Sequence, residues 1–118
     1  MHNYKELQVW QRAMNLAVNT YNLTSYFSEK EQRIFSSQLS RCAISIASNI
    51  AEGAGKESSK DFCRYLSISE GSSFELETQL IIIMDLIPSC KEKVEALLVD
   101  AIIIQKMIYK LRISNKRK

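Results

Sequence analysis

Apolar side chains recur at alternating spacings of three and four residues through four separate stretches of the chain. This spacing puts them on one face of an α-helix, so each stretch is predicted to be an amphipathic helix. The predicted helices cover about residues 5–26, 29–54, 59–87 and 90–112, and no strand-like alternation competes with them. The predicted core seams are Leu7, Trp10, Met14, Ala17 and Tyr21; Phe35, Leu39, Cys42, Ile46 and Ile50; Phe62, Leu66, Ser69, Ser73, Leu76, Leu80, Ile83 and Ile87; and Val94, Leu97, Ala101, Ile104, Ile108 and Leu111.

Particular residues at the ends of these stretches set the predicted boundaries. Pro88 ends the third helix, because proline disfavours helical geometry in the residue before it. Gly53 and Gly55 are expected to adopt left-handed conformations that end the second helix near Ala54. The predicted N-terminal signals are a capping box of Ser28 with Glu31, an N-cap at Ser58 or Ser59, and a capping box of Ser89 with Glu92.

The connections between the predicted helices are short, so consecutive helices are expected to run antiparallel. A chain of 118 residues is about one domain long, and three Gly and one Pro leave little material for the many turns of an all-β fold. We therefore predict a single all-α domain over 1–118, an antiparallel up-down-up-down four-helix bundle with a basic tail at 113–118.

Two features go beyond a plain bundle. The third and fourth helices are apolar around most of their circumference near Ile81, Ile82, Ile102 and Ile103. Self-association would bury this surplus, and wider packing inside the bundle is the alternative. Gly71 lies in the middle of a helix, where it either lets another helix approach closely or marks a bend. We predict a homo-oligomer with these isoleucines at its interface.

Charge is distributed unevenly along the chain. The net charge is +3, from 16 basic and 13 acidic residues. Six of the basic residues lie from position 106 onward, where no acidic residue occurs, so the rest of the chain has 10 basic and 13 acidic residues and a net charge of −3. Such a basic end can attract polyanions, or it can serve only as a solubilising tail. Its residues are Lys106, Lys110, Arg112, Lys116, Arg117 and Lys118.

Residues that could carry catalysis or bind a metal are sparse. Nucleophilic catalysis needs a serine or cysteine with a base nearby, and the only histidine is His2, at the start of the chain. Cys42, Cys63 and Cys90 form no close pair of the kind a structural zinc site needs, so we expect reduced thiols packed as small apolar groups. We predict no catalytic residue, metal site or cofactor.

The sequence also indicates a compartment. The first residues are polar and mixed in charge, so a secretory signal is not expected. The longest uninterrupted apolar run, Leu80 to Met84, is far shorter than the roughly 18–20 residues that cross a bilayer. Reduced thiols suit a reducing compartment, so we expect a soluble cytoplasmic protein without membrane contact.

The segment from Ser45 to Gly53 is the most distinctive part of the sequence, a helix end rich in small polar residues. Asn49 lies one turn after Ser45 beside the core seam, where a buried amide needs hydrogen-bond partners. We expect Asn49 and Glu52 to bridge the end of the second helix to the start of the third or to a neighbouring subunit. Contact with a ligand is the alternative.

Five segments resemble the 23S rRNA intervening-sequence protein family, also described as bacterial four-helix-bundle proteins. They are residues 27–31, 38–43, 45–53, 62–68 and 71–80, and the resemblance covers nearly the whole chain. The resemblance implies a homopentameric ring of four-helix bundles. The family is similar to the accessory variability protein of diversity-generating retroelements, which implies contact with RNA or DNA and with a protein partner such as a reverse transcriptase. It implies no catalytic residue.

The chain departs from the family pattern at a few positions. Ser28 and Ala47 stand where the family often has proline, and Glu70 stands where it often has a basic residue. Glu70 weakens the expectation of nucleic-acid contact at that surface. The positive charge would then come from Arg41, Lys56, Lys60 and Arg64 together with the basic end.

Three classes of function remain. A nucleic-acid-binding oligomer would act through arrayed cations, with sequence-tolerant and salt-sensitive binding. A protein-interaction scaffold without direct nucleic-acid contact is the alternative, and the clustering or dispersal of the cations distinguishes the two. An enzyme is disfavoured, because the chain lacks a set of base, nucleophile and metal ligands.

Overall fold

The computed structural model describes residues 2–116 and contains five α-helices in that range. They are α1 (Gln8–Leu23), α2 (Glu29–Glu31), α3 (Ser37–Ala54), α4 (Ser59–Leu86) and α5 (Lys91–Lys116). A π-helical turn at Gln32–Ser36 joins α2 to α3, and 3₁₀ turns occupy Tyr4–Glu6, Thr24–Tyr26 and Pro88–Cys90. The predicted second helix is thus α2, the π turn and α3 in one helical run.

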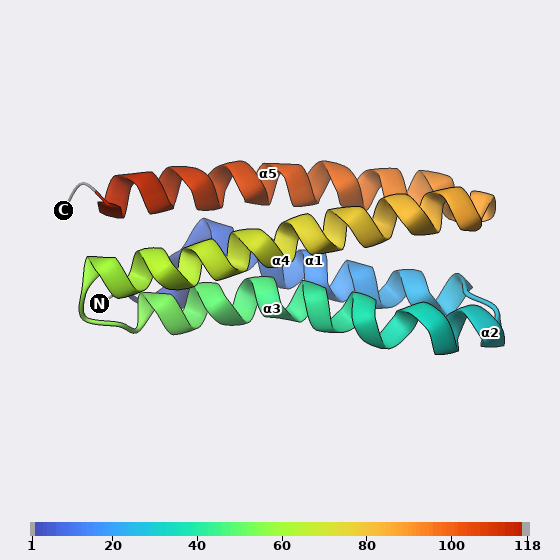
Figure 1. Cartoon of the computed structure of the whole chain (residues 1–118), viewed down its shortest axis with the longest axis horizontal. Coiled ribbons are helices and arrows are strands. Elements are labelled where there is room, and N and C mark those ends of the chain that lie inside the picture. The colour runs from blue at the N-terminus through green and yellow to red at the C-terminus, as the bar shows by residue number, and fades with distance from the viewer. Residues whose placement is uncertain (1, 117–118) are drawn as a thin grey trace.

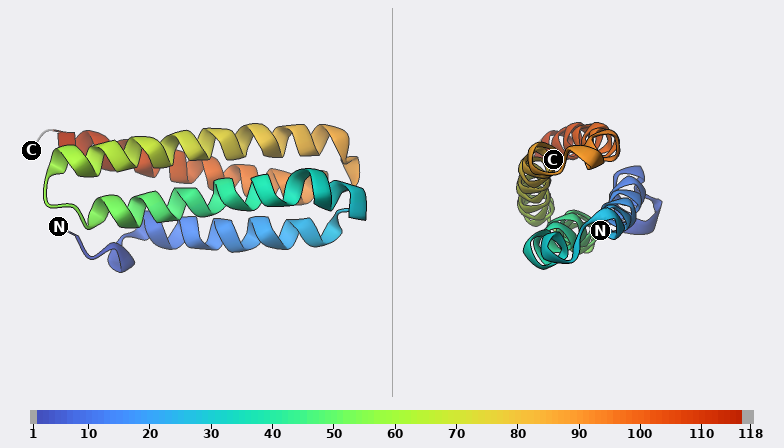
Figure 2. Two further views of the ribbon diagram at one scale, coloured as in Figure 1. Left: turned by 60° about the horizontal axis from the view of Figure 1, so that its bottom comes forward. Right: turned by 90° about the vertical axis from the view of Figure 1, so that its right-hand side faces the viewer.

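The four long helices form an elongated bundle of 47 × 20 × 19 Å (Figure 1). α1 packs against α3 and α5, and α4 packs against the same two helices, so the order around the bundle is α1–α3–α4–α5. The end-on view of Figure 2 shows the long helices arranged around a common axis, and their buried apolar side chains form one core cluster. Both termini lie at the end where α4 begins and α5 finishes (Figure 1). The predicted all-α four-helix bundle is confirmed.

Three of the four predicted seams are correct. Every predicted seam residue of α4 is buried, and so are those of α3 and α5 except the half-buried Phe35 and Leu111. The seam of α1 is wrong, because Met14 and Tyr21 are 41% and 67% exposed. The buried face of α1 is instead Val9, Ala13, Leu16, Thr20 and Leu23.

The α1 error has a physical cause. The buried face contains a small residue and a polar one, Ala13 and Thr20, and both are fully buried. Small side chains let α1 lie close to its neighbours on this face, so the apolar Met14 and Tyr21 remain outside the core. The predicted seam is therefore a second apolar face of α1, partly open to solvent.

The helix ends agree in part with the predicted signals. The Ser28–Glu31 capping box forms, and the Ser58 hydroxyl caps α4 by accepting from the Asp61 amide. The Ser89–Glu92 capping box is wrong: Ser89 lies inside a 3₁₀ turn that leads directly into α5. Pro88 does end the third helix, since α4 stops at Leu86.

Two further boundaries are corrected. Gly55 has φ −80° and ψ −8°, and no described glycine has a positive φ, so the left-handed ending of α3 is wrong. The Gly55 amide reaches the Ala51 and Glu52 carbonyls from a right-handed conformation. Residues 113–116 of the predicted tail belong to α5, where Asn115 is buried and donates to the Leu111 carbonyl at 2.9 Å.

None of the helices formed by residues 2–116 combines the length and the apolar character needed to cross a membrane.

Candidate nucleic-acid interface

The corner between α3 and α4 is built on a close approach of the two helices. A Cβ atom added to Gly53 would lie 2.7 Å from the Tyr65 Cβ and 3.0 Å from the Phe62 Cδ1. Any side chain at position 53 would therefore collide with the first turns of α4. Gly53, part of the distinctive segment of the sequence, lets Tyr65 rest directly on the end of α3.

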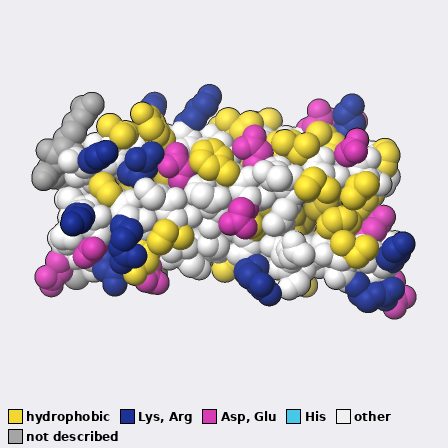
Figure 3. All heavy atoms as spheres, viewed as in Figure 1, with side chains coloured by type: hydrophobic (Ala, Val, Ile, Leu, Met, Phe, Trp, Pro, Cys, Tyr) yellow, Lys and Arg dark blue, Asp and Glu magenta, His cyan; other side chains and the backbone are white. Residues whose placement is uncertain are grey.

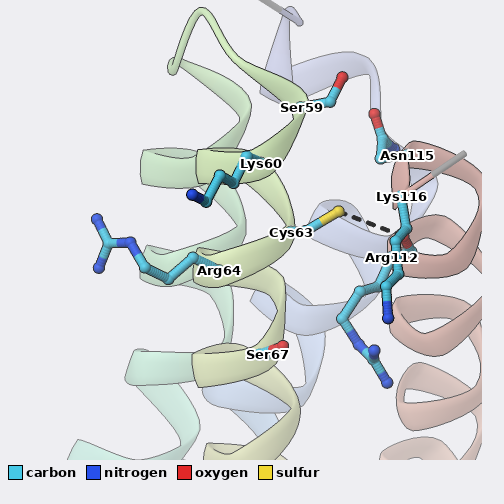
Figure 4. A pocket seen from close by; sticks show the side chains of 8 residues that line it. All are labelled: Ser59, Lys60, Cys63, Arg64, Ser67, Arg112, Asn115 and Lys116. Carbon is cyan, nitrogen blue, oxygen red and sulfur yellow. Dashed lines mark hydrogen bonds between the residues drawn. The ribbon is translucent and has the colours of Figure 1, made fainter. Parts of the chain in front are cut away.

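Two of the predicted nucleic-acid-binding residues, Lys56 and Arg64, lie against the Tyr65 ring, and a third, Lys60, lies one turn before Arg64. The Lys56 Nζ lies 5.3 Å from the centroid of the Tyr65 ring, and the Arg64 guanidinium carbon lies 4.5 Å from it. Lys60 precedes Arg64 by one turn of α4, and both side chains are exposed. Figure 4 shows both extending from the same side of α4, away from α5. We call Lys56, Lys60, Arg64 and Tyr65 the Tyr65 cluster.

Cation–π contact holds these positive charges without neutralising them, so they remain available to a phosphate. The three cations were predicted from the sequence, whereas Tyr65 was not. The available signal was a basic residue at every fourth position, 56, 60 and 64, followed immediately by an aromatic residue. The acidic side chains of Glu57 and Asp61, also exposed, lie in the same part of the sequence and reduce the local positive charge.

A groove of about 380 Å³ separates the start of α4 from the end of α5. Ser59, Cys63 and Ser67 line it from α4, with Asn115 and Lys116 from α5 (Figure 4). The Cys63 thiol donates to the Arg112 carbonyl at 3.4 Å, which ties the two helices together. Lys60 and Arg64 border this groove but extend away from α5, so their charges do not converge in it.

The Arg112 side chain forms an ion pair within the fold. Its guanidinium forms an ion pair with Glu70 at 3.1 Å, and the two side chains are 22% and 15% exposed. The guanidinium carbon also lies 5.4 Å from the centroid of the Tyr109 ring. Glu70, the unusual acid noted in the sequence, therefore neutralises Arg112 and joins α4 to α5.

The other predicted cations are dispersed. Lys106, Lys110 and Lys116 are exposed on α5, and Arg41 is exposed on α3. In Figure 3, Lys and Arg side chains gather over the end where α4 begins and α5 finishes, with others elsewhere on this face. Arg117 and Lys118 lie outside the described residues.

The polar segment of α3 is joined to the middle of α4. The Asn49 amide donates to the Ser45 carbonyl at 2.8 Å and to the Ser45 hydroxyl at 3.0 Å. The Ser45 and Ser72 hydroxyls are 2.8 Å apart. The predicted bridge to the start of α4 is wrong, since the connection runs through Ser45 to the middle of that helix. Glu52 is exposed, and its side chain forms no hydrogen bond or ion pair with the described residues 2–116.

The isoleucines predicted to be surplus to the core are at the surface. Ile81, Ile82 and Ile102 are 47%, 46% and 37% exposed, and Ile103 is half-buried. Gln105 of α5 donates to Glu77 of α4 at 2.9 Å, so Ile102 and Ile81, each about one turn away, lie at a similar level. We call these four residues the isoleucine face.

Gly71 is exposed, and a Cβ there would meet nothing within 4 Å.

A second apolar surface lies between α1 and α3. This α1–α3 groove has a volume of about 510 Å³. This groove was not predicted, because several of its residues belong to the predicted core seam of α1. Its apolar lining includes Tyr4, Trp10, Met14, Ala17, Val18, Tyr21, Ile44 and Ala47.

Within residues 2–116 no three histidine, cysteine or acidic side chains are grouped as a metal site would require. Cys42, Cys63 and Cys90 are free thiols, with Cys42 and Cys90 buried, as the sequence predicted.

Comparison with curated proteins gives no match. Comparison with family models matches residues 5–110 to the model described as 23S rRNA-intervening sequence protein. The match spans all the long helices except the last residues of α5. The resemblance noted in the sequence is thereby confirmed, and the chain belongs to the 23S rRNA-intervening sequence protein family.

Proposed function

We propose that the protein is a non-enzymatic, oligomeric accessory protein that binds RNA or DNA through basic surfaces at one end of the bundle. The observation that carries the proposal is the Tyr65 cluster, in which Lys56 and Arg64 flank an aromatic ring and Lys60 lies one turn away. Cations with an adjacent aromatic are suited to a sugar–phosphate backbone and its unstacked bases.

Binding of this kind is electrostatic and tolerant of sequence. Phosphate contacts need arrayed lysine and arginine side chains, and they release counterions, so affinity falls steeply as salt rises. Lys106, Lys110 and Lys116 are dispersed along α5, so the proposal depends on the Tyr65 cluster, and Arg112 contributes little because Glu70 neutralises it. One basic end per subunit offers few phosphate contacts. Several copies in one assembly would raise the effective concentration of binding sites for the nucleic acid.

Self-association is the second part of the proposal. The α1–α3 groove and the isoleucine face are two apolar surfaces, and the helix order α1–α3–α4–α5 sets them on opposite sides of the bundle. Two different apolar surfaces favour a head-to-tail contact, and such a contact forms a ring when the rotation from one subunit to the next closes. The family resemblance suggests five subunits.

The test measures the mass of the assembly and its affinity for nucleic acid on the same sample. Light scattering gives the mass of the assembly, and fluorescence anisotropy of labelled RNA and DNA gives its affinity across a salt series. The proposal predicts a multimer whose affinity falls linearly on a logarithmic salt scale. An intact multimer that binds neither nucleic acid at low salt would refute nucleic-acid binding, and a monomer would refute self-association.

The alternative function is a protein-interaction scaffold without nucleic-acid contact. The α1–α3 groove favours it, because an apolar groove between two helices can hold an amphipathic helix of a partner such as a reverse transcriptase. A multimer that binds the partner protein and no nucleic acid would support the scaffold.

A further inference from the structure

A polar groove of about 470 Å³ lies between α3 and α4, separate from the Tyr65 cluster. Gln38, Arg41 and Ser45 line it from α3, and Ser72, Glu75 and Gln79 line it from α4. These residues belong to three of the five segments that carry the family resemblance: 38–43 and 45–53 on α3, and 71–80 on α4. The fold thus brings separate distinctive segments to one site.

The base of the groove is held by partly buried contacts. The Ser45 and Ser72 hydroxyls are 2.8 Å apart, and Asn49 donates to Ser45 from one turn further along α3. The Cys42 thiol donates to the Glu75 carboxylate at 3.6 Å and accepts from the Gln79 amide at 3.7 Å. Burial, with the Glu75 charge beside it, raises the pKa of Cys42 to about 11, so the thiol keeps its proton at neutral pH.

Two opposite charges border the groove without neutralising each other. The ion pairs within residues 2–116 are Arg33 with Glu29 and Arg112 with Glu70, so Arg41 and Glu75 are in neither. The Arg41 guanidinium makes one long contact, to the Ser37 hydroxyl at 3.5 Å. Most of its donors and most of the acceptor capacity of the Glu75 carboxylate are therefore free for a ligand.

A planar guanidinium pairs with two acceptors side by side, and a carboxylate pairs with two donors side by side. Guanine presents both sets on adjoining edges: O6 and N7 accept, while N1–H and the N2 amino group donate. Adenine and uracil lack both paired sets, and cytosine lacks the paired donors. We propose that this groove binds an unstacked guanine base of single-stranded nucleic acid, with Glu75 on the N1–N2 edge and Arg41 on O6 and N7.

The proposal rests on the proposed nucleic-acid binding and adds a base preference to it. Arg41 precedes the end of α3 by 13 residues. At about 1.5 Å per residue, the groove and the Tyr65 cluster are roughly 20 Å apart along the helix. A strand of about ten nucleotides reaches both, given a spacing of about 3.4 Å per nucleotide even in stacked form.

The experiment compares labelled oligouridylates of that length with and without one central guanosine, at one salt concentration, by fluorescence anisotropy. The full chain is expected to bind the guanosine oligonucleotide about ten-fold more tightly, within the range of one bidentate base contact. An oligonucleotide with inosine, which lacks the N2 amino group, is expected to bind with intermediate affinity.

Glu75→Gln and Arg41→Gln are each expected to abolish the guanosine preference, whereas Glu75→Gln keeps the affinity for plain oligouridylate. Both side chains are exposed, so neither change threatens the fold, and thermal unfolding checks this. Glu95→Gln, an exposed acid on α5, is the matched control and keeps the preference.

Equal binding of the two oligonucleotides by the unchanged protein would overturn the guanine site and leave the proposed function intact. A preference that survives Glu75→Gln would also overturn it. Failure to bind any oligonucleotide at low salt would overturn both proposals.

Discussion

Gly53 and Gly71 show how differently two glycines act within one bundle. Gly53 lies where a methyl group would be 2.7 Å from the Tyr65 Cβ, whereas the space beside Gly71 is open to 4 Å. Neither has a positive φ, so the distinction is one of packing and not of backbone conformation.

Gly53→Ala is expected to destabilise the fold by about 1–3 kcal/mol, because α3 and α4 must separate to admit the methyl group. Gly71→Ala is expected to stabilise it by about 0.5–1 kcal/mol, through the helix propensity of alanine. Urea unfolding monitored by circular dichroism measures both. A loss of stability in Gly71→Ala would mean that a second copy packs against Gly71, the close approach that the sequence left open.

Cys42 should give the protein a measurable dependence on alkaline pH. Its pKa is raised from 9.0 to about 11, mainly by burial and then by Glu75. The unfolded thiol loses its proton first as the pH rises, so the stability that the thiol contributes is intact below pH 9 and is lost towards pH 11. The free energy of unfolding is therefore expected to fall more steeply over this range in the unchanged protein than in Cys42→Ala. Parallel pH profiles for the two proteins would contradict this.

At the scale of single elements, α4 and α5 are joined by polar contacts as well as by their seams. The Glu70–Arg112 pair is mostly buried, and the Cys63 thiol donates to the Arg112 carbonyl. A partly buried pair with good geometry contributes more than an exposed one.

A double-mutant cycle of Glu70→Gln and Arg112→Gln tests this junction. We expect a coupling energy of about 1 kcal/mol in urea unfolding, because each single change leaves a charge without its partner. Arg112→Gln is expected to leave the affinity for nucleic acid almost unchanged. A ten-fold loss of that affinity would mean that Arg112 contacts phosphate despite Glu70.

The helices themselves could largely be predicted from the sequence. The seams of α3, α4 and α5 follow from their spacing, because large apolar residues occupy one stripe on each. In α1 the pattern was ambiguous, since Ala13 and Thr20 face the core while Trp10, Met14 and Tyr21 carry more apolar surface outside it. The spacing of apolar residues indicates which face of a helix is most apolar. It does not indicate how closely the backbones of two helices approach each other.

Only the charged residues of the candidate site could be predicted from the sequence. Lys56, Lys60 and Arg64 were identified from residue type and the family resemblance, but their arrangement around Tyr65 depends on the packing at Gly53. The ion pair of Arg112 with Glu70 joins positions 42 residues apart and has no local signal. Polar contacts between helices require the relative register of those helices, which spacing within each helix does not supply.

At the scale of the whole molecule, the proposed function assigns assembly to two apolar faces and nucleic-acid binding to one basic end. Val18 lines the α1–α3 groove, while the neighbouring Asn19 faces the α5 side of α1. Val18→Glu is expected to shift the assembly to smaller mass in light scattering, because it buries an unpaired charge in the contact. Asn19→Glu adds the same charge and is expected to leave the mass unchanged. An unchanged mass in Val18→Glu would remove the groove from the interface.

The most direct test of nucleic-acid binding at the Tyr65 cluster compares two variants. Each loses two positive charges, one variant at the cluster and the other at the opposite end of the bundle. Lys60→Ala with Arg64→Ala alters the cluster, and Lys30→Ala with Lys91→Ala alters exposed lysines at the opposite end. The affinity of each variant for a labelled single-stranded oligonucleotide is measured across a salt series.

We predict that the first pair lowers the slope of log affinity against log salt by about 1.4, the loss of two single-strand phosphate contacts. The second pair should leave the slope unchanged. Equal slopes for the two variants would contradict the placement of the nucleic acid at the Tyr65 cluster.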